Sequence, residues 1–131
     1  MTIAEDTAAL SNAFLRALAE GRHDFRIPAG THVIAGDLLK TRLCHISNND
    51  HGLKPILFDI DSAEDFLLDG QGAVLQCYGN VLPIRVGSSR RITIRNLTID
   101  WVRPFFTQAI VVESGPGWVE FEYDPARYPL E

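Results

Sequence analysis

The sequence predicts an all-β fold, a right-handed parallel β-helix of about four coils that is preceded by a capping α-helix. Two observations support this prediction. Apolar residues recur every 26 positions, and short stretches within each repeat alternate apolar and polar side chains, which is the period of a β-strand. Strands that recur with too little chain between them for a crossover helix are expected to stack as a solenoid. An antiparallel sandwich with accidental spacing is the alternative.

The first expected element is an amphipathic helix over about residues 7–20. Its apolar side chains recur at helical spacing, Asp6 or Thr7 is a suitable N-cap, and Gly21 stands where a helix is expected to stop. We expect this helix to lie over the first coil and to cover its apolar interior and its unpaired strand edge.

The coils are expected over about residues 25–131, and the repeat is clear over residues 56–114. Its columns are Ile34, Ile60, Val86 and Val112; Phe58, Ile84 and Ile110; Ser62, Ser88 and Ser114; Phe66 and Ile92; Leu68 and Ile94; and Ala73 and Ile99. The apolar columns are the predicted core. The repeat fits poorly in the first coil and slips by one residue after the turn at 115–117.

Outward-facing charges predict ion pairs between neighbouring coils. Three acids stand 26 residues before three arginines: Glu64 before Arg90, Asp65 before Arg91, and Asp69 before Arg95. Opposite charges on neighbouring strands attract each other. We therefore interpret these carboxylates as partners of the arginines rather than as catalytic acids.

Composition narrows the function classes. The chain has 131 residues, 12 Lys and Arg against 17 Asp and Glu, and a formal charge of −5, without a basic cluster. We therefore predict neither nucleic acid nor a membrane as a partner. The first residues lack the basic and apolar regions of a signal peptide, so the chain as it stands is expected in the cytoplasm. Cys44 and Cys77 are too few for a disulfide framework and are predicted to be buried thiols.

Three stretches point to a known family. They are Cys44-His45-Ile46-Ser47-Asn48-Asn49-Asp50, Phe66-Leu67-Leu68-Asp69-Gly70-Gln71-Gly72-Ala73, and Arg91-Ile92-Thr93-Ile94-Arg95-Asn96-Leu97-Thr98-Ile99-Asp100-Trp101 with Pro104 and Gln108. Together they resemble the N-terminal region of glycoside hydrolase family 110, whose members are exo-acting α-1,3-galactosidases built on a pectin-lyase-like parallel β-helix. The first stretch is the most specific to this family. The resemblance covers about residues 25–112.

The resemblance implies hydrolysis of terminal α-linked galactose with inversion, by two carboxylates about 6.5 to 9.5 Å apart. Members of the family are several times longer, and their acid pair belongs to later coils, beyond residue 131. Residues 125–131 offer no amphipathic cap. We therefore expect residues 1–131 to form a single incomplete domain that is truncated at its C-terminus, is inactive by itself, and self-associates through its open last coil. The family would allow a secreted or periplasmic protein, and no cofactor is expected.

Asp100, Trp101 and Gln108 are the predicted substrate-binding residues. A carboxylate beside an aromatic ring suits a sugar, because the ring packs against C–H groups while the acid accepts hydrogen bonds from hydroxyls. The alternative is that Trp101 and the following aromatics merely cover the last apolar layer. His45, His51 and Asp50 suggest a metal site, but residues 47–50 are typical of a turn, so no metal is predicted.

Two other function classes stay open. A polysaccharide lyase on the same scaffold would need an acidic cluster for Ca²⁺ and a basic proton acceptor. Asp59 and Asp61 stand two apart, but Arg85 and Gly87, which align with them, are not acidic. A non-catalytic carbohydrate-binding or structural module is the third class.

Overall fold

The structure is a computed structural model that describes residues 2–46, 50–104 and 106–128. It divides into two compact units, an N-terminal unit of residues 1–101 and a C-terminal unit of residues 102–131. The elements are α1 (Ile3–Ala19), β1 (Asp24–Arg26), β2 (Thr31–Ala35), a 3₁₀ turn (Gly36–Leu38), β3 (Thr41–His45), β4 (His51–Asp61), β5 (Glu64–Tyr78), β6 (Leu82–Gly87), β7 (Arg90–Trp101), β8 (Ile110–Gly115) and β9 (Trp118–Glu122). Among the described residues, no helix has the length and apolar character needed to cross a membrane.

Helix α1 begins earlier than the predicted range of 7–20. Thr2 is its N-cap: the Thr2 hydroxyl accepts a hydrogen bond from the Glu5 backbone N–H at 3.2 Å, and the Glu5 carboxylate accepts one from the Thr2 backbone N–H at 2.7 Å. This reciprocal pair is a capping box, whose Thr-x-x-Glu pattern is visible in the sequence. Gly21 follows the helix with a φ of 69°, as expected of a helix stop.

Asp6 and Thr7, the two predicted N-caps, lie inside α1 and bind the edge of β2. The Asp6 carboxylate accepts a hydrogen bond from the Val33 backbone N–H at 2.8 Å. The Thr7 hydroxyl donates to the Val33 carbonyl at 3.2 Å and accepts from the Ala35 N–H at 3.1 Å. Helix α1 therefore covers an edge of β2, rather than the first coil of a solenoid as predicted.

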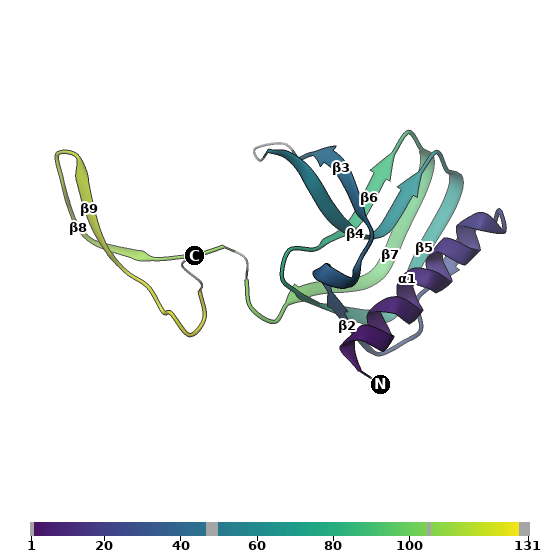
Figure 1. The fold of residues 1–131 in the computed structure, drawn as a ribbon, viewed down its shortest axis with the longest axis horizontal. Coiled ribbons are helices and arrows are strands. Elements are labelled where there is room, and N and C mark those ends of the chain that lie inside the picture. Colours follow the sequence, from purple (N-terminus) through teal and green to yellow (C-terminus); the bar gives the residue numbers. More distant parts are fainter. Residues whose placement is uncertain (1, 47–49, 105, 129–131) are drawn as a thin grey trace. The chain divides into compact units, whose positions relative to one another are not determined.

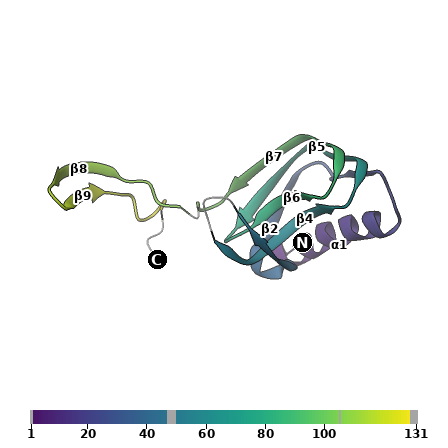
Figure 2. The same ribbon diagram turned by 90° about the horizontal axis from the view of Figure 1, so that it is seen from above.

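The described residues of the N-terminal unit form two sheets. In the first, the long strand β5 pairs in parallel with β1 and β2 along one edge and with β7 along the other. In the second, β4 pairs antiparallel with β3 and in parallel with β6. Figure 2 shows β5 beside β7 and β4 beside β6. The C-terminal unit contains the antiparallel hairpin of β8 and β9 (Figure 1).

The predicted right-handed parallel β-helix of about four coils is wrong. Within the described residues, the strands form three separate sheets, and none of these closes on itself. The first sheet has only parallel pairs, the second has both kinds, and the third is antiparallel. In place of a first coil, β3 folds back on β4 as a hairpin. In place of a last coil, residues 110–122 fold back on themselves across the turn at 115–117. Short connections favour such local antiparallel pairs over parallel pairing with a distant strand.

The 26-residue offset nevertheless sets the register of the parallel pairs. Phe58 pairs with Ile84, Ile60 with Val86, Phe66 with Ile92, and Leu68 with Ile94. The backbone at the corners repeats as well: Ser62 and Ser88 have φ values of 54° and 46°, and Asp65 and Arg91 have values of 53° and 56°. The repeat therefore records equivalent strands and corners within the N-terminal unit.

The offset changes within the pair formed by β5 and β7. Ala73 pairs with Leu97 rather than with the predicted Ile99, because the register shifts between Asp69 and Ala73. Gly70 stands at this corner, where a Cβ atom would collide with the carbonyl group of Asn96. The prediction also fails in the first coil, since Ile34 pairs with Cys77.

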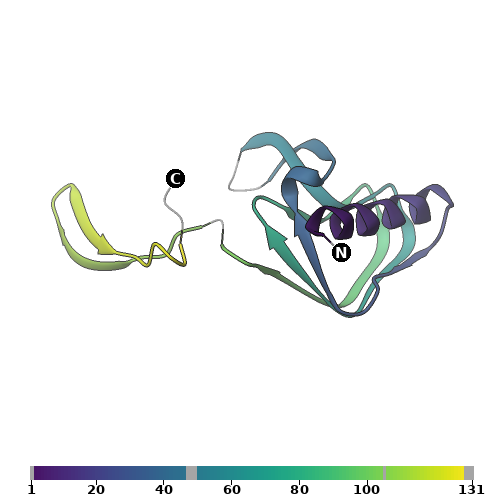
Figure 3. The same cartoon turned by 60° about the horizontal axis from the view of Figure 1, so that its bottom comes forward.

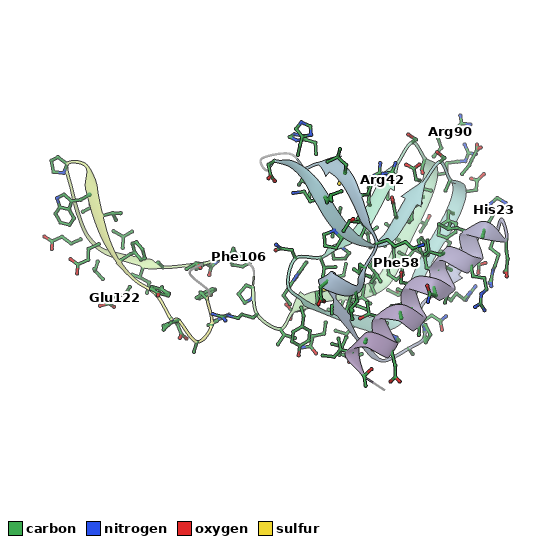
Figure 4. All side chains as sticks on the ribbon, viewed as in Figure 1. His23, Arg42, Phe58, Arg90, Phe106 and Glu122 are labelled. Carbon is green, nitrogen blue, oxygen red and sulfur yellow. The ribbon has the colours of Figure 1, made fainter. Side chains whose placement is uncertain are left out.

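The core of the N-terminal unit lies between α1 and the strands (Figure 3). Phe14 is fully buried, and its ring meets the rings of Phe25, Phe58 and Phe66 edge-on, with centroids 5.5, 5.0 and 6.3 Å away. Figure 4 shows Phe58 beside the helix, on the side of the strands. Such edge-to-face contacts add to the stability gained by burying the apolar surface.

That residues 1–131 make one incomplete domain stays a prediction.

Candidate functional site

Asp100 and Trp101, two of the predicted substrate-binding residues, are the last two residues of strand β7. The Trp101 Nε1–H donates a hydrogen bond to the Gly79 carbonyl at 3.1 Å, and the Asp100 carboxylate accepts one from the Trp101 backbone N–H at 2.8 Å. Trp101 is partly buried and packs against the core, whereas Asp100 is exposed. The indole thus covers the core, and its contact with a sugar stays a prediction.

Gln108, the third predicted residue, belongs to the C-terminal unit. Its amide oxygen accepts a hydrogen bond from the Tyr128 hydroxyl at 3.0 Å, and it lines an open hollow of about 500 Å³ with Ile110 and Tyr123. The structure therefore brings together Asp100 and Trp101, while Gln108 lies in the other unit. Phe105, one of the aromatics expected to cover the core, lies outside the described residues.

The three ion pairs predicted from the repeat are confirmed. Glu64 lies 3.1 Å from Arg90, Asp65 binds the guanidinium of Arg91, and Asp69 lies 2.9 Å from Arg95. Arg91 also binds Glu64, so the first two pairs join into one exposed network. Arg91 lowers the pKa of the Asp65 carboxyl. These charges hold neighbouring strands in register.

Asp69 is the most strongly held of these carboxylates. Hydrogen bonds from the Gln71 backbone N–H at 3.0 Å, from the Asn96 amide at 3.2 Å and from Arg95 lower its pKa to about 2. Its side chain is only 6% exposed. A general acid needs a pKa near the working pH, so Asp69 is unsuited to protonate a leaving group.

A further charge cluster joins β3, β4 and β6. Arg85 Nη1 lies 2.8 Å from an Asp59 oxygen and 3.0 Å from an Asp61 oxygen, and Arg42 lies 3.0 Å from Asp59 and 3.7 Å from Asp61. Arg85 lowers the pKa of the Asp61 carboxyl. The 26-residue offset between Asp59 and Arg85 was a visible signal for this pair. Arg42 gave none, because its approach depends on the β3–β4 hairpin.

His45 and His51 face each other across the β3–β4 hairpin, with ring centroids 4.5 Å apart. Asp50 lies 3.0 Å from the Lys54 ammonium, which lowers the pKa of the Asp50 carboxyl. Residues 47–49 of the predicted turn lie outside the described residues. In the described part of the chain, no group of three or more His, Cys, Asp or Glu residues is arranged to hold a metal ion.

Both cysteines are free thiols, as predicted. Cys77 is buried, and burial followed by the nearby Asp100 carboxylate raises the pKa of its thiol to about 11. Cys44 is half-buried rather than buried. A thiol with such a high pKa is almost wholly protonated at neutral pH, so Cys77 acts in packing.

The chain is similar to proteins named alpha-1,3-galactosidase. It is 39% identical over 67 residues to alpha-1,3-galactosidase A of Shewanella woodyi, covering 51% of this chain and 11% of that protein. It is 34% identical over 103 residues to alpha-1,3-galactosidase B of Phocaeicola vulgatus, covering 78% and 16%, and 28% identical over 113 residues to alpha-1,3-galactosidase B of Akkermansia muciniphila, covering 86% and 14%. No family model matches.

These relatives confirm the resemblance to the α-1,3-galactosidases that the three sequence stretches predicted. The match to curated relatives spans 11 to 17% of their length.

Proposed function

We propose that this chain, a relative of the α-1,3-galactosidases, is the N-terminal portion of a glycosidase that releases terminal α-linked galactose with inversion of the anomeric centre. The similarity over as much as 86% of the chain to proteins of that name carries the proposal. The substrate is a carbohydrate that ends in α-linked galactose.

The arrangement of charge indicates that the carboxylates of β4 and β5 are not the catalytic acids. Inversion requires one carboxylic acid to protonate the leaving oxygen and one carboxylate to activate water. In the described strands β4 and β5, each Asp and Glu carboxylate binds at least one arginine. An arginine partner favours the ionised form and leaves no lone carboxyl to donate a proton. We propose that these five carboxylates are not the acid pair and that, as the resemblance to longer family members implies, the pair lies beyond residue 131.

The test compares the 131-residue chain with the whole protein that contains it, using an α-1,3-linked galactosyl disaccharide as substrate. We expect the whole protein to release free galactose and the 131-residue chain to release none. Proton NMR at early times should show β-galactose as the first product, since inversion of an α-linkage forms the β-anomer.

Three other results would contradict the proposal. Galactose release by the 131-residue chain would place the acid pair within it. An unsaturated product that absorbs ultraviolet light would indicate a lyase, and no product from the whole protein would favour a non-catalytic carbohydrate-binding module.

Self-association of the isolated chain is part of the proposal. Within the described residues, β6 pairs only with β4 and β7 only with β5, so each has an outer edge without a strand partner. Exposed apolar residues lie on both strands, with Val86 48% and Ile94 41% exposed. Unpaired edges are templates for pairing with another chain. A concentration-dependent increase in mass by light scattering supports this proposal, and a constant monomer mass contradicts it.

A further inference from the structure

An open hollow of about 460 Å³ lies on the N-terminal unit, and the arginine-bound carboxylates are not among its lining residues. The 3₁₀ turn, the start of β3, the middle of β4 and the end of β5 contribute its walls. The lining residues are Gly36, Asp37, Leu39, Thr41, Pro55, Tyr78, Gly79 and Asn80. Its volume falls within the roughly 300 to 1,000 Å³ typical of small-molecule sites.

Close backbone packing holds two walls of the hollow together. Gly36 lies against the backbone of Asn80, and a Cβ atom at position 36 would collide with the Asn80 carbonyl. Asp37 follows Gly36 in the 3₁₀ turn, so this contact fixes the acid close to the end of β5. The backbone of Gly79 has a φ of 69°, which turns the chain sharply after Tyr78. The walls are therefore preformed rather than parts of a long loop.

The chemistry of the lining suits a neutral sugar. Tyr78 is 42% exposed and supplies an aromatic ring, while Asp37, Thr41 and Asn80 supply acceptors and donors. No lysine or arginine lies among the lining residues, so an anion would meet only the negative charge of Asp37. One carboxylate is also too little for a tight calcium site, which takes six to eight oxygen ligands.

The hollow adjoins Trp101, one of the predicted substrate-binding residues. Trp101 donates its indole N–H to the carbonyl of Gly79, a lining residue. The end of β7 is thereby attached to the wall of the hollow, and Asp100 precedes Trp101 on that strand. A bound sugar would have two aromatic residues in its neighbourhood, although the sequence gave no sign of Tyr78.

We propose that this hollow binds one neutral pyranose unit of a carbohydrate chain, with the Tyr78 ring against the C–H face of the sugar and with Asp37 and Asn80 bonded to its hydroxyls. The inference rests on the proposed function in its choice of ligand class. It adds a sugar-holding site built from residues of this chain, and such a site would position the carbohydrate without taking part in bond cleavage.

The test titrates methyl α-galactopyranoside into the ¹⁵N-labelled 131-residue chain and follows the amide signals by NMR. We expect saturable shifts of the lining residues, Asp37 and Asn80 in particular, and of the Trp101 indole N–H. Asp37→Asn and Tyr78→Ala should each weaken the affinity roughly tenfold, which is the size expected for loss of a hydrogen bond to a charged group or of an aromatic contact. Tyr78→Phe keeps the ring and should bind almost as tightly as the unaltered chain.

Leu38→Ala is the matched control. Leu38 belongs to the same 3₁₀ turn as Asp37 and is 49% exposed, but it does not line the hollow. Its substitution should leave the affinity unchanged. For each variant, the amide spectrum without sugar should match that of the unaltered chain away from the substituted residue, which shows that the unit is folded.

Three results would overturn the proposal: no shifts at roughly 100 mM sugar, far above the millimolar range of weak binding; shifts confined to the hollow around Gln108; or equal affinity for Asp37→Asn, Tyr78→Ala and Leu38→Ala. The binding assay involves no turnover, so it separates the two proposals. Galactose release by the whole protein without binding at this hollow would overturn only the present inference. Binding without galactose release would overturn only the proposed function.

Discussion

The apolar residues of the 26-residue pattern are buried on β4 of the N-terminal unit and exposed on β8 of the C-terminal unit. In the N-terminal unit, Phe58 and Ile60 of β4 are fully buried and pair with Ile84 and Val86 of β6. In the C-terminal unit, the equivalent positions of β8 are exposed, with Ile110 at 73% and Val112 at 49%. Strand β8 pairs antiparallel with β9.

The difference shows what hydrophobic periodicity specifies and what it leaves open. Periodicity says which side chains share a face of a strand, but it does not say which strand becomes the neighbour. The N-terminal unit offers its strands a helix and the Phe14 ring to pack against, whereas the turn at 115–117 offers β8 a partner a few residues away. Burial therefore stabilises one pattern, and local hydrogen bonding stabilises the other.

The largest effect on stability is expected when a charge replaces an apolar residue of one repeat column, once in the N-terminal unit and once in the C-terminal unit. Ile60→Asp puts an unpaired carboxylate at a fully buried position and should cost more than about 4 kcal/mol, enough to unfold the N-terminal unit. Val112→Asp, its counterpart in β8, should leave that unit folded. Urea unfolding followed by circular dichroism measures both. A cooperatively folded Ile60→Asp variant would show that burial does not distinguish the units.

A smaller loss is expected when an aromatic ring is removed from each unit. Phe14→Ala removes the ring that contacts three other phenylalanines and should lower the free energy of unfolding by about 3 to 5 kcal/mol. Phe121→Ala removes a ring that is 45% exposed and only 6.3 Å from that of Tyr123, and should cost under about 1 kcal/mol. Equal losses in thermal or urea unfolding would contradict the contrast drawn between the units.

The fold was predictable where a physical signal was local or repeated. The helix was visible from its apolar spacing, although its N-cap is Thr2 and not the predicted Asp6 or Thr7. The register of β4 with β6 followed from the offset, because equivalent side chains occupy equivalent places on stacked strands. The closed solenoid did not follow, since the hairpins of β3 with β4 and of β8 with β9 depend on competition between near and distant partners.

The candidate site was predictable to a lesser degree. The pairing of Asp69 with Arg95 was readable from two numbers that differ by 26. The hollow between Asp37 and Asn80 was not, because these residues are 43 positions apart, which is not the repeat length, and come near each other through the contact of Gly36 with the Asn80 backbone. Sites assembled from corners of different strands carry no periodic signal.

Acid should weaken the N-terminal unit in a way that depends on Asp69. The pKa of this carboxyl is about 2 in the folded chain and about 3.9 in an unfolded one, so its ionised form stabilises the fold above about pH 4. That contribution is lost as the pH falls from about 4 to about 2. The melting temperature of Asp69→Asn should therefore fall less steeply over this interval than that of the unaltered chain.

Glu120→Gln on β9 provides the control for this pH dependence. Glu120 is exposed and lies in the C-terminal hairpin, so the variant should keep the slope of the unaltered chain. If Asp69→Asn and Glu120→Gln show the same slope of melting temperature against pH, the bonds from Gln71, Asn96 and Arg95 do not set the acid response.

The smallest effects are expected from exposed arginines. Arg90 is 73% exposed and lies at the corner between β6 and β7 (Figure 4), where it pairs with Glu64, while Arg127 of the C-terminal unit lies 5.3 Å from the centre of the Tyr128 ring. Arg90→Ala and Arg127→Ala should each change the free energy of unfolding by no more than about 0.5 kcal/mol, because water solvates an exposed charge almost equally well in the folded and the unfolded chain. Urea unfolding of both variants measures this difference. A much larger loss for Arg90→Ala than for Arg127→Ala would contradict the contrast between the units. It would mean that the N-terminal unit depends on its surface ion pairs for stability, and not mainly on the core around Phe14.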